Sequence, residues 1–413
     1  MVLGKRSQFS LFGFVTVVIA FGGLVLFLLC YSKTRSGVVA SQQSLDFGVG
    51  NSANYGEWFR VDGPSMAPTL FGSCRQWSCR GCGEANFSFV LNREGDAASK
   101  TACSVCGLIV EVADIQAEYP GDRVNASLFS STDSQSREHL ERGALVIVSN
   151  ETGLHVKRLV GLPGDTIGLK GVHLTINGVR IEDALVEHPI RFSLPWLLVS
   201  GDRSAGKVQS SVVASKERSS REVNRRVSEI WVPQGDSKDK MIFSPGTLDP
   251  RGVSSPVWDD FTFNIGISRR LFSVDRLRVS GIALDTTDLR VYFWTEEGVR
   301  CVDRSLREGE WFQVSCFEGT LAFQDENVFV VDQEHPIALI SSVQASAVTD
   351  LAVERLLEYR IRPQDRMMYP LLLRAGEYFV LGDNVPLSVD SRNWGPLGRQ
   401  EIKGQVECLQ RDL

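Results

Sequence analysis

The chain has 413 residues, enough for two or three domains. Its net charge of -6 leaves no excess of basic residues, which excludes nucleic acid as the expected partner. With 37 glycines and 15 prolines the chain suits many turns, so the composition favours a mostly β fold over a helical one.

The first feature along the chain is an uncharged apolar run at residues 11–31. About twenty such residues cross a bilayer core of about 30 Å as a helix. A cleaved secretory signal is the alternative, but its apolar part is usually only about 7–15 residues long. Lys33 and Arg35 also stand where small cleavage-site residues would be expected. Residues 1–35 therefore predict an uncleaved membrane anchor, whose orientation the nearly symmetric flanking charges do not determine.

Residues 36–55 are small and polar, and predict a linker. No second apolar run of comparable length follows, so we expect one ectodomain on a single tether. Apolar and polar residues alternate, as in half-buried strands, in segments 57–61, 123–128, 144–149, 155–160, 172–176 and 377–381.

A cysteine-rich segment spans residues 72–112. Cys79 and Cys82 form one C-x2-C pair, and Cys103 and Cys106 form another twenty residues later. This spacing is typical of a four-cysteine zinc ribbon, in which each pair brings two thiolates to one metal ion. Two disulfides, or a ribbon that has lost its metal, are the alternatives. We expect a structural Zn²⁺ held by these four cysteines.

Residues 190–373 form a second long insertion. Its part from 210 to 226 is rich in charged residues and predicts an exposed segment. Short apolar and aromatic runs at regular spacing follow, which favour a small β-sandwich. Cys301 and Cys316 could face each other there, as a disulfide or as two buried thiols.

Ser65 raises the question of catalysis, because it lies in the turn-like motif GPSMAPTL at residues 63–70. A serine hydroxyl needs a base, and none of the five histidines lies in a motif typical of a Ser/His/Asp enzyme. A Ser–Lys pair is the other arrangement. Lys157 is the candidate, since on an extended strand it would point into a cleft while Arg158, on the opposite face, stays solvated. Burial would lower the pKa of Lys157 from its ordinary value of about 10.4 and leave a neutral amine.

Five segments occur in an order that resembles the type I signal peptidase family, membrane-anchored serine–lysine endopeptidases. They are GPSMAPTL (63–70), GDRVNASLFS (121–130), VKRLVGLPGDTI (156–167), LTINGVRI (174–181) and GDNVPLSVDSRNWGPL (382–397). The resemblance covers the anchor and the segments around these motifs, and neither insertion. It implies a mostly β, signal-peptidase-like catalytic domain made of residues 56–189 and 374–413.

The resemblance also implies roles for individual residues. Ser65 matches the nucleophile and Lys157 the general base, while the Ser65 backbone N–H supplies one oxyanion donor. Ser388 matches a serine that hydrogen-bonds and orients the lysine. Polar residues that hold this loop beside the site are matched by Asp383, Asp390 and Arg392.

Two other positions near the nucleophile carry expectations. Met66 matches a residue on an apolar surface near the membrane. Gly63 stands where many members carry a serine with a second oxyanion donor, so here that donor must be backbone, water or absent. Residues 385–387, Val-Pro-Leu, replace the usual polar run after GDN, which leaves the hydrogen bonding of that loop open.

The resemblance implies a membrane-bound serine endopeptidase that removes signal peptides from exported proteins through an acyl-enzyme. It would cut after small residues in an A-x-A-like pattern and need no cofactor, so any zinc would be structural. The expected partners are signal peptides of secreted preproteins, the bilayer and the export machinery, with the catalytic domain on the extracytoplasmic side of the cytoplasmic membrane. The alternatives are an inactive membrane-anchored binding module on a peptidase-like scaffold, and a Ser–Lys autoprotease of the repressor type, which the anchor disfavours.

Overall fold

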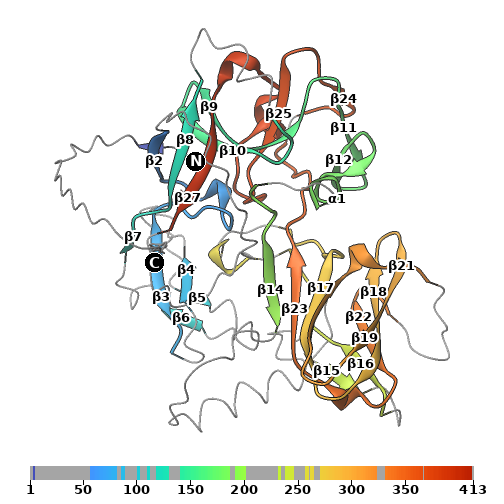
Figure 1. The fold of residues 1–413 in the computed structure, drawn as a ribbon. Helices are drawn as coiled ribbons and strands as arrows, with labels where there is room; N and C mark the ends of the chain where they lie inside the picture. The colour runs from blue at the N-terminus through green and yellow to red at the C-terminus, as the bar shows by residue number, and fades with distance from the viewer. Residues whose placement is uncertain are drawn as a thin grey trace, which may run out of the picture.

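Strands make up nearly all of the regular structure, which confirms the predicted mostly β fold (Figure 1). The computed structural model describes residues 3–4, 56–80, 85–88, 100–102, 109–111, 118–129, 140–186, 191–200, 231–233, 238–245, 256–259, 261–264, 270–322, 331–365 and 367–411.

The largest sheet among the described residues has eight strands, and its neighbouring strands pair antiparallel. Its order is β1 (Leu3–Gly4), β2 (Glu57–Val61), β8 (Arg123–Leu128), β27 (Ile402–Gln410), β9 (Leu145–Asn150), β10 (Gly153–Gly161), β25 (Glu377–Leu381) and β26 (Leu397–Gly398). Because β27 lies between β8 and β9, the end of the chain completes the sheet that its earlier strands begin.

Both faces of β10 are covered by apolar side chains. Val156 belongs to a buried cluster with Leu145, and Leu159 to a second cluster with Val146 and Val380. A polar side chain on such a strand has no solvated side and needs a partner within the protein.

A smaller sheet lies beside the first. Its order is β13 (Val179–Arg180), β12 (His173–Ile176), β11 (Thr166–Lys170) and β24 (Leu371–Leu372), and the short helix α1 (Ile181–Val186) follows β13. Val160 of β10, Ile167 of β11 and Tyr359 share one apolar cluster. The segment around Tyr359 therefore packs against the strands that carry the motif VKRLVGLPGDTI.

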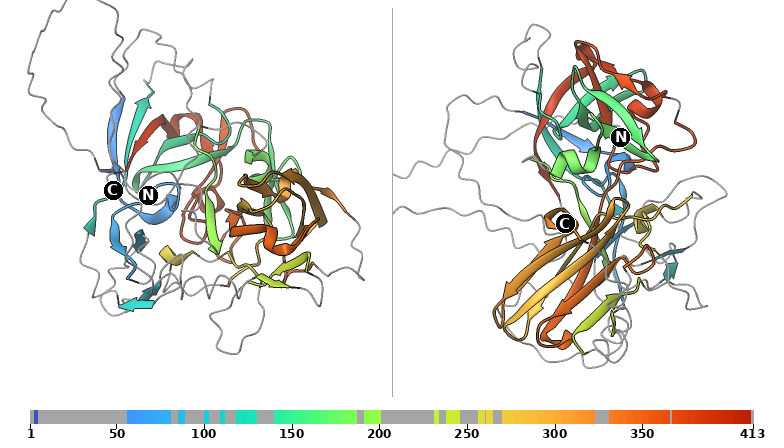
Figure 2. Two further views of the ribbon diagram at one scale, coloured as in Figure 1. Left: turned by 60° about the horizontal axis from the view of Figure 1, so that its bottom comes forward. Right: turned by 90° about the vertical axis from the view of Figure 1, so that its right-hand side faces the viewer.

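Two further sheets pack face to face as a sandwich. One has the order β14 (Trp196–Ser200), β23 (Val348–Leu356), β17 (Leu277–Ala283) and β20 (Trp311–Ser315). The other has the order β15 (Trp231–Pro233), β16 (Lys240–Phe243), β22 (Ile337–Ser341), β18 (Thr287–Thr295), β19 (Gly298–Leu306) and β21 (Thr320–Leu321). Val279 and Val353 of the first sheet share a core with Val291 and Leu339 of the second. Figure 2 shows, at right, the sandwich below the eight-stranded sheet. In Figure 1 the start of β14 and the end of β23 point toward the part that contains the eight-stranded sheet.

Short strands follow the nucleophile motif. β3 (Cys74–Ser78) pairs with β4 (Ala85–Ser88) and β7 (Glu118–Tyr119), and β5 (Lys100–Ala102) pairs with β6 (Ile109–Glu111). Phe71 stacks on Phe87 with 4.4 Å between ring centroids, which ties these strands to the chain just after Ser65.

Several sequence predictions fall outside the described residues. The predicted anchor at 11–31 and the linker at 36–55 are among them. Within the described ranges, no helix has the length and apolar character needed to cross a membrane. The division into domains stays a prediction.

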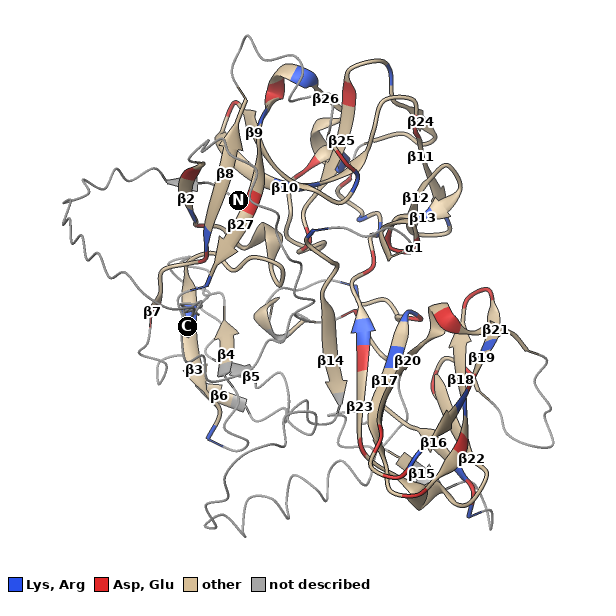
Figure 3. Ribbon diagram, in the orientation of Figure 1, with Lys and Arg blue, Asp and Glu red and all other residues tan. Residues whose placement is uncertain are grey.

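Cys301 and Cys316 are free thiols, Cys316 buried and Cys301 partly exposed, so the disulfide alternative is wrong. Figure 3 shows acidic and basic residues interspersed over both parts, in keeping with the net charge of -6.

Candidate active site

Ser65 lies on a single 3-10 turn, η1 (Pro64–Met66), shortly after β2. Proline suits the start of such a turn because its missing N–H would have no partner there. The N–H of Ala67 donates to the Pro64 carbonyl at 3.1 Å and closes the turn. The Ser65 side chain ends up almost buried, with 5% of the residue exposed.

Gly63, just before this turn, and Met66, its last residue, lie in different surroundings. Gly63 precedes the turn in an extended conformation and offers no side-chain donor. Met66 is fully buried in an apolar cluster with Phe59 and Val61. The expectation that Met66 lies on an exposed apolar surface is therefore wrong for this chain, because neighbouring strands cover it.

Lys157 of β10 points at Ser65. Its Nζ lies 3.0 Å from Ser65 Oγ and 2.9 Å from Ser388 Oγ, and the residue is fully buried. These three residues are separated by up to 323 positions in sequence. The pairing of β10 with β25 brings Lys157 to the loop of Ser388, and the turn of Ser65 follows β2 of the same sheet. The structure thus joins the three residues that the motifs single out.

Burial lowers the pKa of Lys157 to about 8, and the positive charges of Arg392 and Arg362 add to this effect. The carboxylates Asp390 and Asp383 act in the opposite direction but do not outweigh burial. About a tenth of the Lys157 amine is therefore neutral at about pH 7, and this fraction can act as a general base.

The loop after β25 holds Ser388 beside the lysine. The Asp390 carboxylate accepts the N–H of Gly382 at 3.0 Å and pairs with Arg392 at 2.7 Å. Although burial raises the pKa of Asp390, the ion pair with Arg392 outweighs burial and lowers it well below the ordinary range. At Gly382 a Cβ would lie 2.1 Å from Ser388 Oγ, so only glycine fits between the loop and the catalytic candidates.

Asp383 forms a second buried ion pair behind the site. It accepts from Arg158 Nη2 at 2.7 Å and Nε at 3.0 Å, and from the Tyr359 hydroxyl at 2.6 Å. The Thr69 hydroxyl, four residues after Ser65, donates to the same carboxylate. The prediction that Arg158 stays solvated is wrong: the residue is fully buried, because both faces of β10 are covered.

The Val-Pro-Leu departure in the loop has a structural explanation. Arg362 Nη1 donates to the Val385 carbonyl at 3.0 Å and also to the Ser388 carbonyl. Arg392 Nη2 donates to the Val385 carbonyl as well, at 3.0 Å. The two arginines therefore hold the loop through its backbone carbonyls, so residues 385–387 need no polar side chains for this purpose.

The sequence motifs missed some residues that hold the site. Arg362 and Tyr359 lie outside every quoted segment, and no local pattern distinguishes them from other surface-type residues. Asn384 lies inside the GDN segment, but the motifs predict no role for it. Its backbone N–H donates to the Ser65 carbonyl at 3.0 Å.

The zinc prediction is open. Cys79 is buried, and the other three proposed ligands, Cys82, Cys103 and Cys106, lie outside the described residues.

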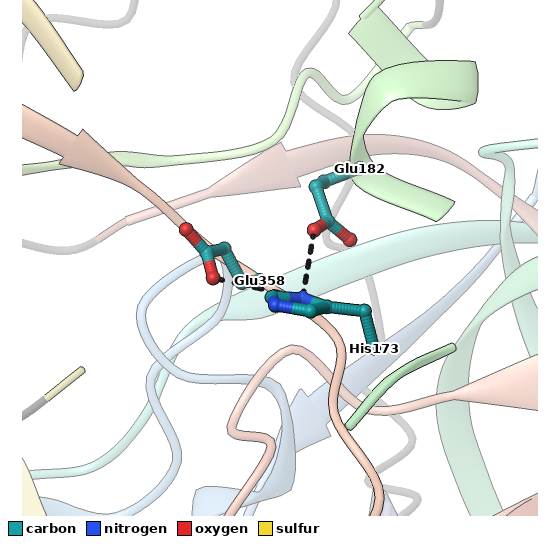
Figure 4. A group of neighbouring side chains, drawn as sticks. All are labelled: His173, Glu182 and Glu358. Atoms are coloured by element: carbon teal, nitrogen blue, oxygen red, sulfur yellow. Dashed lines mark ion pairs between the residues drawn. The ribbon is translucent and has the colours of Figure 1, made fainter. Parts of the chain in front are cut away.

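Elsewhere in the described chain, His173 of β12, Glu182 of α1 and Glu358 come together (Figure 4) with their ligand atoms within 4.8 Å of one another. Such residues suit a divalent cation. However, Arg180 already occupies them: its Nε lies 2.6 Å from Glu182 Oε1, and its Nη2 lies 3.1 Å from Glu358 Oε2. A metal ion would have to displace a guanidinium from the same oxygens, so the cluster fits an ion-pair network better than a metal site.

This network joins the smaller sheet to the sandwich. Arg180 pairs with Asp275 at 2.9 Å, and the neighbouring Arg276 pairs with Asp183 at 2.7 Å. Asp275 and Arg276 directly precede β17, whereas Arg180 and Asp183 belong to β13 and α1. Both partners of the Arg180–Asp275 pair are buried, which makes that contact sensitive to the loss of one charge, whereas Asp183 is partly exposed.

His173 gives the network a pH dependence. Burial alone lowers the pKa of His173, but two carboxylates outweigh burial and raise the pKa to about 8: Glu182, 3.6 Å from Nδ1, and Glu296, 3.2 Å from Nε2. Because the folded state holds this proton more tightly than the unfolded chain, the stabilisation is complete below about pH 6.5 and is lost as the pH rises through about 8.

We expect His173→Gln to remove about 2 kcal/mol of stability below about pH 6 and almost none above about pH 9. Urea unfolding of both proteins at the two pH values measures this difference. His335→Gln, at a partly exposed histidine, is the control for the effect of the substitution itself. An equal loss at both pH values for His173→Gln would contradict the role of the proton.

Comparison with known proteins gives evidence about the family of this chain that is separate from the geometry. A sequence model of the family described as "Signal peptidase, peptidase S26" matches residues 103–236 and 320–409. Signal peptidase I S of Bacillus subtilis (strain 168) is 31% identical over 72 residues, which are 17% of this chain and 39% of that protein. Signal peptidase I of Bacillus amyloliquefaciens is 42% identical over 43 residues, 10% of this chain and 23% of that protein. Signal peptidase I P of Bacillus subtilis subsp. natto is 36% identical over 63 residues, 15% of this chain and 34% of that protein.

The alignments with these three relatives each span less than two fifths of the relative's length. The ranges of the family match contain Lys157 and Ser388, whereas Ser65 precedes the first range and residues 237–319 lie between the two. Since the match covers more than half of the chain, the chain belongs to the signal peptidase family, peptidase S26.

Proposed function

We propose that this chain is a membrane-bound serine endopeptidase that removes N-terminal signal peptides from exported proteins. The observation that carries the proposal is the 3.0 Å distance between Lys157 Nζ and Ser65 Oγ in a member of this family. A serine and a lysine with a lowered pKa make an activated nucleophile. The names of the three relatives support the class of substrate.

In the proposed reaction, neutral Lys157 accepts the hydroxyl proton of Ser65 while Oγ attacks the carbonyl carbon of the scissile bond. Lys157 then gives this proton to the leaving amine, the mature protein departs, and the signal peptide remains as an ester on Ser65. Next, Lys157 accepts a proton from water, whose oxygen attacks the ester. The signal peptide leaves as a carboxylic acid, and the proton returns to Ser65. Ser388 orients the lysine throughout, at 2.9 Å from Nζ.

The Ser65 backbone N–H is the proposed first oxyanion donor. Since Gly63 has no hydroxyl, the second donor is a backbone N–H or a water molecule. The reaction uses side chains and water alone and needs no cofactor. A Zn²⁺ ion would therefore have only a structural role, at Cys79, Cys82, Cys103 and Cys106.

The proposed substrates carry small residues at the first and third positions before the cut. Residues 11–31 would anchor the chain in the cytoplasmic membrane, with the catalytic residues on the extracytoplasmic side, near signal peptides and the export machinery. A single crossing would put Leu3–Gly4 and β2 on opposite sides of the bilayer, whereas the structure pairs them as neighbouring strands. The pairing and the inserted anchor exclude each other, so we propose that insertion releases β1 from the sheet.

Ser65→Ala tests the proposal. We expect this change to lower cleavage of a preprotein with an A-x-A site by about 10,000-fold or more, because the nucleophile is lost. The assay uses the full chain in detergent and separates precursor from product by mass. Ser305→Ala, at an exposed serine of β19, is the matched control and should cleave normally. A preprotein with bulky residues at both positions should stay intact. Normal cleavage by Ser65→Ala would contradict the mechanism, and equal cleavage of both preproteins would contradict the specificity.

A further inference from the structure

A pair of buried amides lies next to the nucleophile turn. Asn264 Nδ2 donates to Asn384 Oδ1 at 2.8 Å, and Asn384 Nδ2 donates to Asn264 Oδ1 at 3.0 Å. Both residues are buried, with 4% and 2% exposed. The two side chains thus satisfy each other in a place that water does not reach.

Asn384 connects this pair to the reacting groups. Its Nδ2 also donates to the Pro64 carbonyl at 3.0 Å, and its backbone N–H donates to the Ser65 carbonyl at 3.0 Å. Its own carbonyl accepts the N–H of Ser388 at 2.8 Å. One residue therefore contacts both the nucleophile turn and the backbone of the serine that faces Lys157.

The partner amide determines which way the Asn384 side chain points. Its two Nδ2 hydrogens go to Pro64 and Asn264, and its Oδ1 accepts from Asn264. Rotation by a half-turn would set Oδ1 against the Pro64 carbonyl, two acceptors facing each other in a buried place. With Asn264 gone, Asn384 would lose one acceptor and one donor and be free to leave this orientation.

Packing of the aromatic residue before Asn264 holds Asn264 next to Asn384. It ends the short turn η4 (Thr262–Asn264), and Phe263 packs on Phe71 with 5.4 Å between ring centroids. Phe263 and Ala67 belong to the same buried cluster. The segment is thereby fastened to the chain immediately after Ser65.

We infer that Asn264 is a positioning residue of the Ser65 site, supplied by a segment outside both ranges of the family match. The inference rests on the proposed function and extends it. Residues 237–319, between the two matched ranges, then contribute to the structure of the active site, in addition to any separate role. Asn264 acts through Asn384, which holds the turn of Ser65 and the loop of Ser388 in register.

Steady-state kinetics test the inference with three variants: Asn264→Ala, Asn384→Ala and the double variant. The assay uses the full chain in detergent and a preprotein with an A-x-A site. We expect kcat of Asn264→Ala to fall by about 10–100-fold with KM nearly unchanged, as for a misplaced nucleophile. In the Asn384→Ala background, Asn264→Ala should lower kcat almost no further, because Asn384, through which Asn264 acts, is already absent. Asn264→Asp, which keeps the shape but loses the donor, should resemble Asn264→Ala and serves if the alanine variant does not fold.

Asn125→Ala is the matched control, since it removes an amide hydrogen bond to a backbone carbonyl, that of Gly56, at 2.9 Å. It should leave kcat unchanged. Normal kcat in Asn264→Ala, or effects of the two single changes that multiply fully in the double variant, would overturn the inference.

Hydrogen exchange separates this inference from the proposed function. The N–H groups of Ala67 and Leu70 are bonded within the nucleophile turn and should exchange faster in Asn264→Ala but not in Asn125→Ala. If Ser65→Ala still cleaved, the proposed function would fail, and the exchange rates alone would decide whether Asn264 holds the turn. Unchanged exchange would overturn the inference.

Discussion

Replacing Lys157 by methionine is expected to abolish cleavage and to stabilise the fold at the same time. Methionine fills similar space but offers Ser65 no base, so kcat/KM should fall by about 10,000-fold or more. Burial holds the pKa of Lys157 at about 8, so at pH 7 the folded protein carries a desolvated ammonium group. Removing it should raise the free energy of unfolding by about 1–3 kcal/mol.

The pH dependence of this effect has a definite sign. Since the pKa of Lys157 is lower in the folded than in the unfolded state, the penalty is complete below about pH 8 and disappears as the pH rises to about 10.4. The stability gain of Lys157→Met should therefore shrink at alkaline pH. For the unmodified protein, kcat/KM should rise through about pH 8 as the amine loses its proton.

Urea unfolding at about pH 7 and about pH 10, with kcat/KM measured from about pH 6 to about pH 9, checks both effects. Lys170→Met is the matched control: its side chain is 57% exposed and pairs with Glu297 at 3.1 Å. That variant should cleave normally and change stability by less than about 1 kcal/mol. A less stable Lys157→Met protein would contradict the desolvation argument, and a rate independent of pH would contradict the role as base.

Asp383→Asn should cause a large loss of stability. Asp383 and Arg158 pair at 2.7 Å with both side chains fully buried. Removing one charge of such a pair leaves the other buried without compensation, which costs about 3–5 kcal/mol. The Tyr359 hydroxyl, which donates to Asp383 at 2.6 Å, would lose its charged acceptor as well.

The comparison is with Asp303→Asn on the sandwich. Asp303 pairs with Arg290 at 2.6 Å, but the two side chains are 67% and 52% exposed. Solvent screens that pair, so its loss should cost less than about 1 kcal/mol. Urea unfolding of both variants measures the difference, and losses of similar size would show that burial of the Arg158–Asp383 pair does not matter.

Much of the candidate site can be predicted from the sequence alone. Ser65, Lys157 and Ser388 each lie in a short motif, and the order of those motifs predicted that they meet. The alternation of apolar residues also located β10 and β25 correctly. Motifs and period-2 patterns are local properties of the chain, so they can be read without knowing what packs against a strand.

The same local rules failed where packing decides the environment. Alternation puts Arg158 on the opposite side of β10 from Lys157, but it does not say whether that side faces solvent or protein. The structure covers it, and Arg158 becomes half of a buried ion pair. Met66 was misjudged for the same reason, since burial depends on the neighbouring strands.

What the sequence by itself determined is the family, the mostly β class and the residues proposed for catalysis. What only the tertiary structure decided is how those residues are held in place. Asn264 hydrogen-bonds Asn384, which lies 120 positions later in the sequence. Arg362 donates to the Val385 carbonyl, although Arg362 itself lies outside every motif. Such contacts involve common polar residues in no recurring pattern, and chain topology alone brings them together.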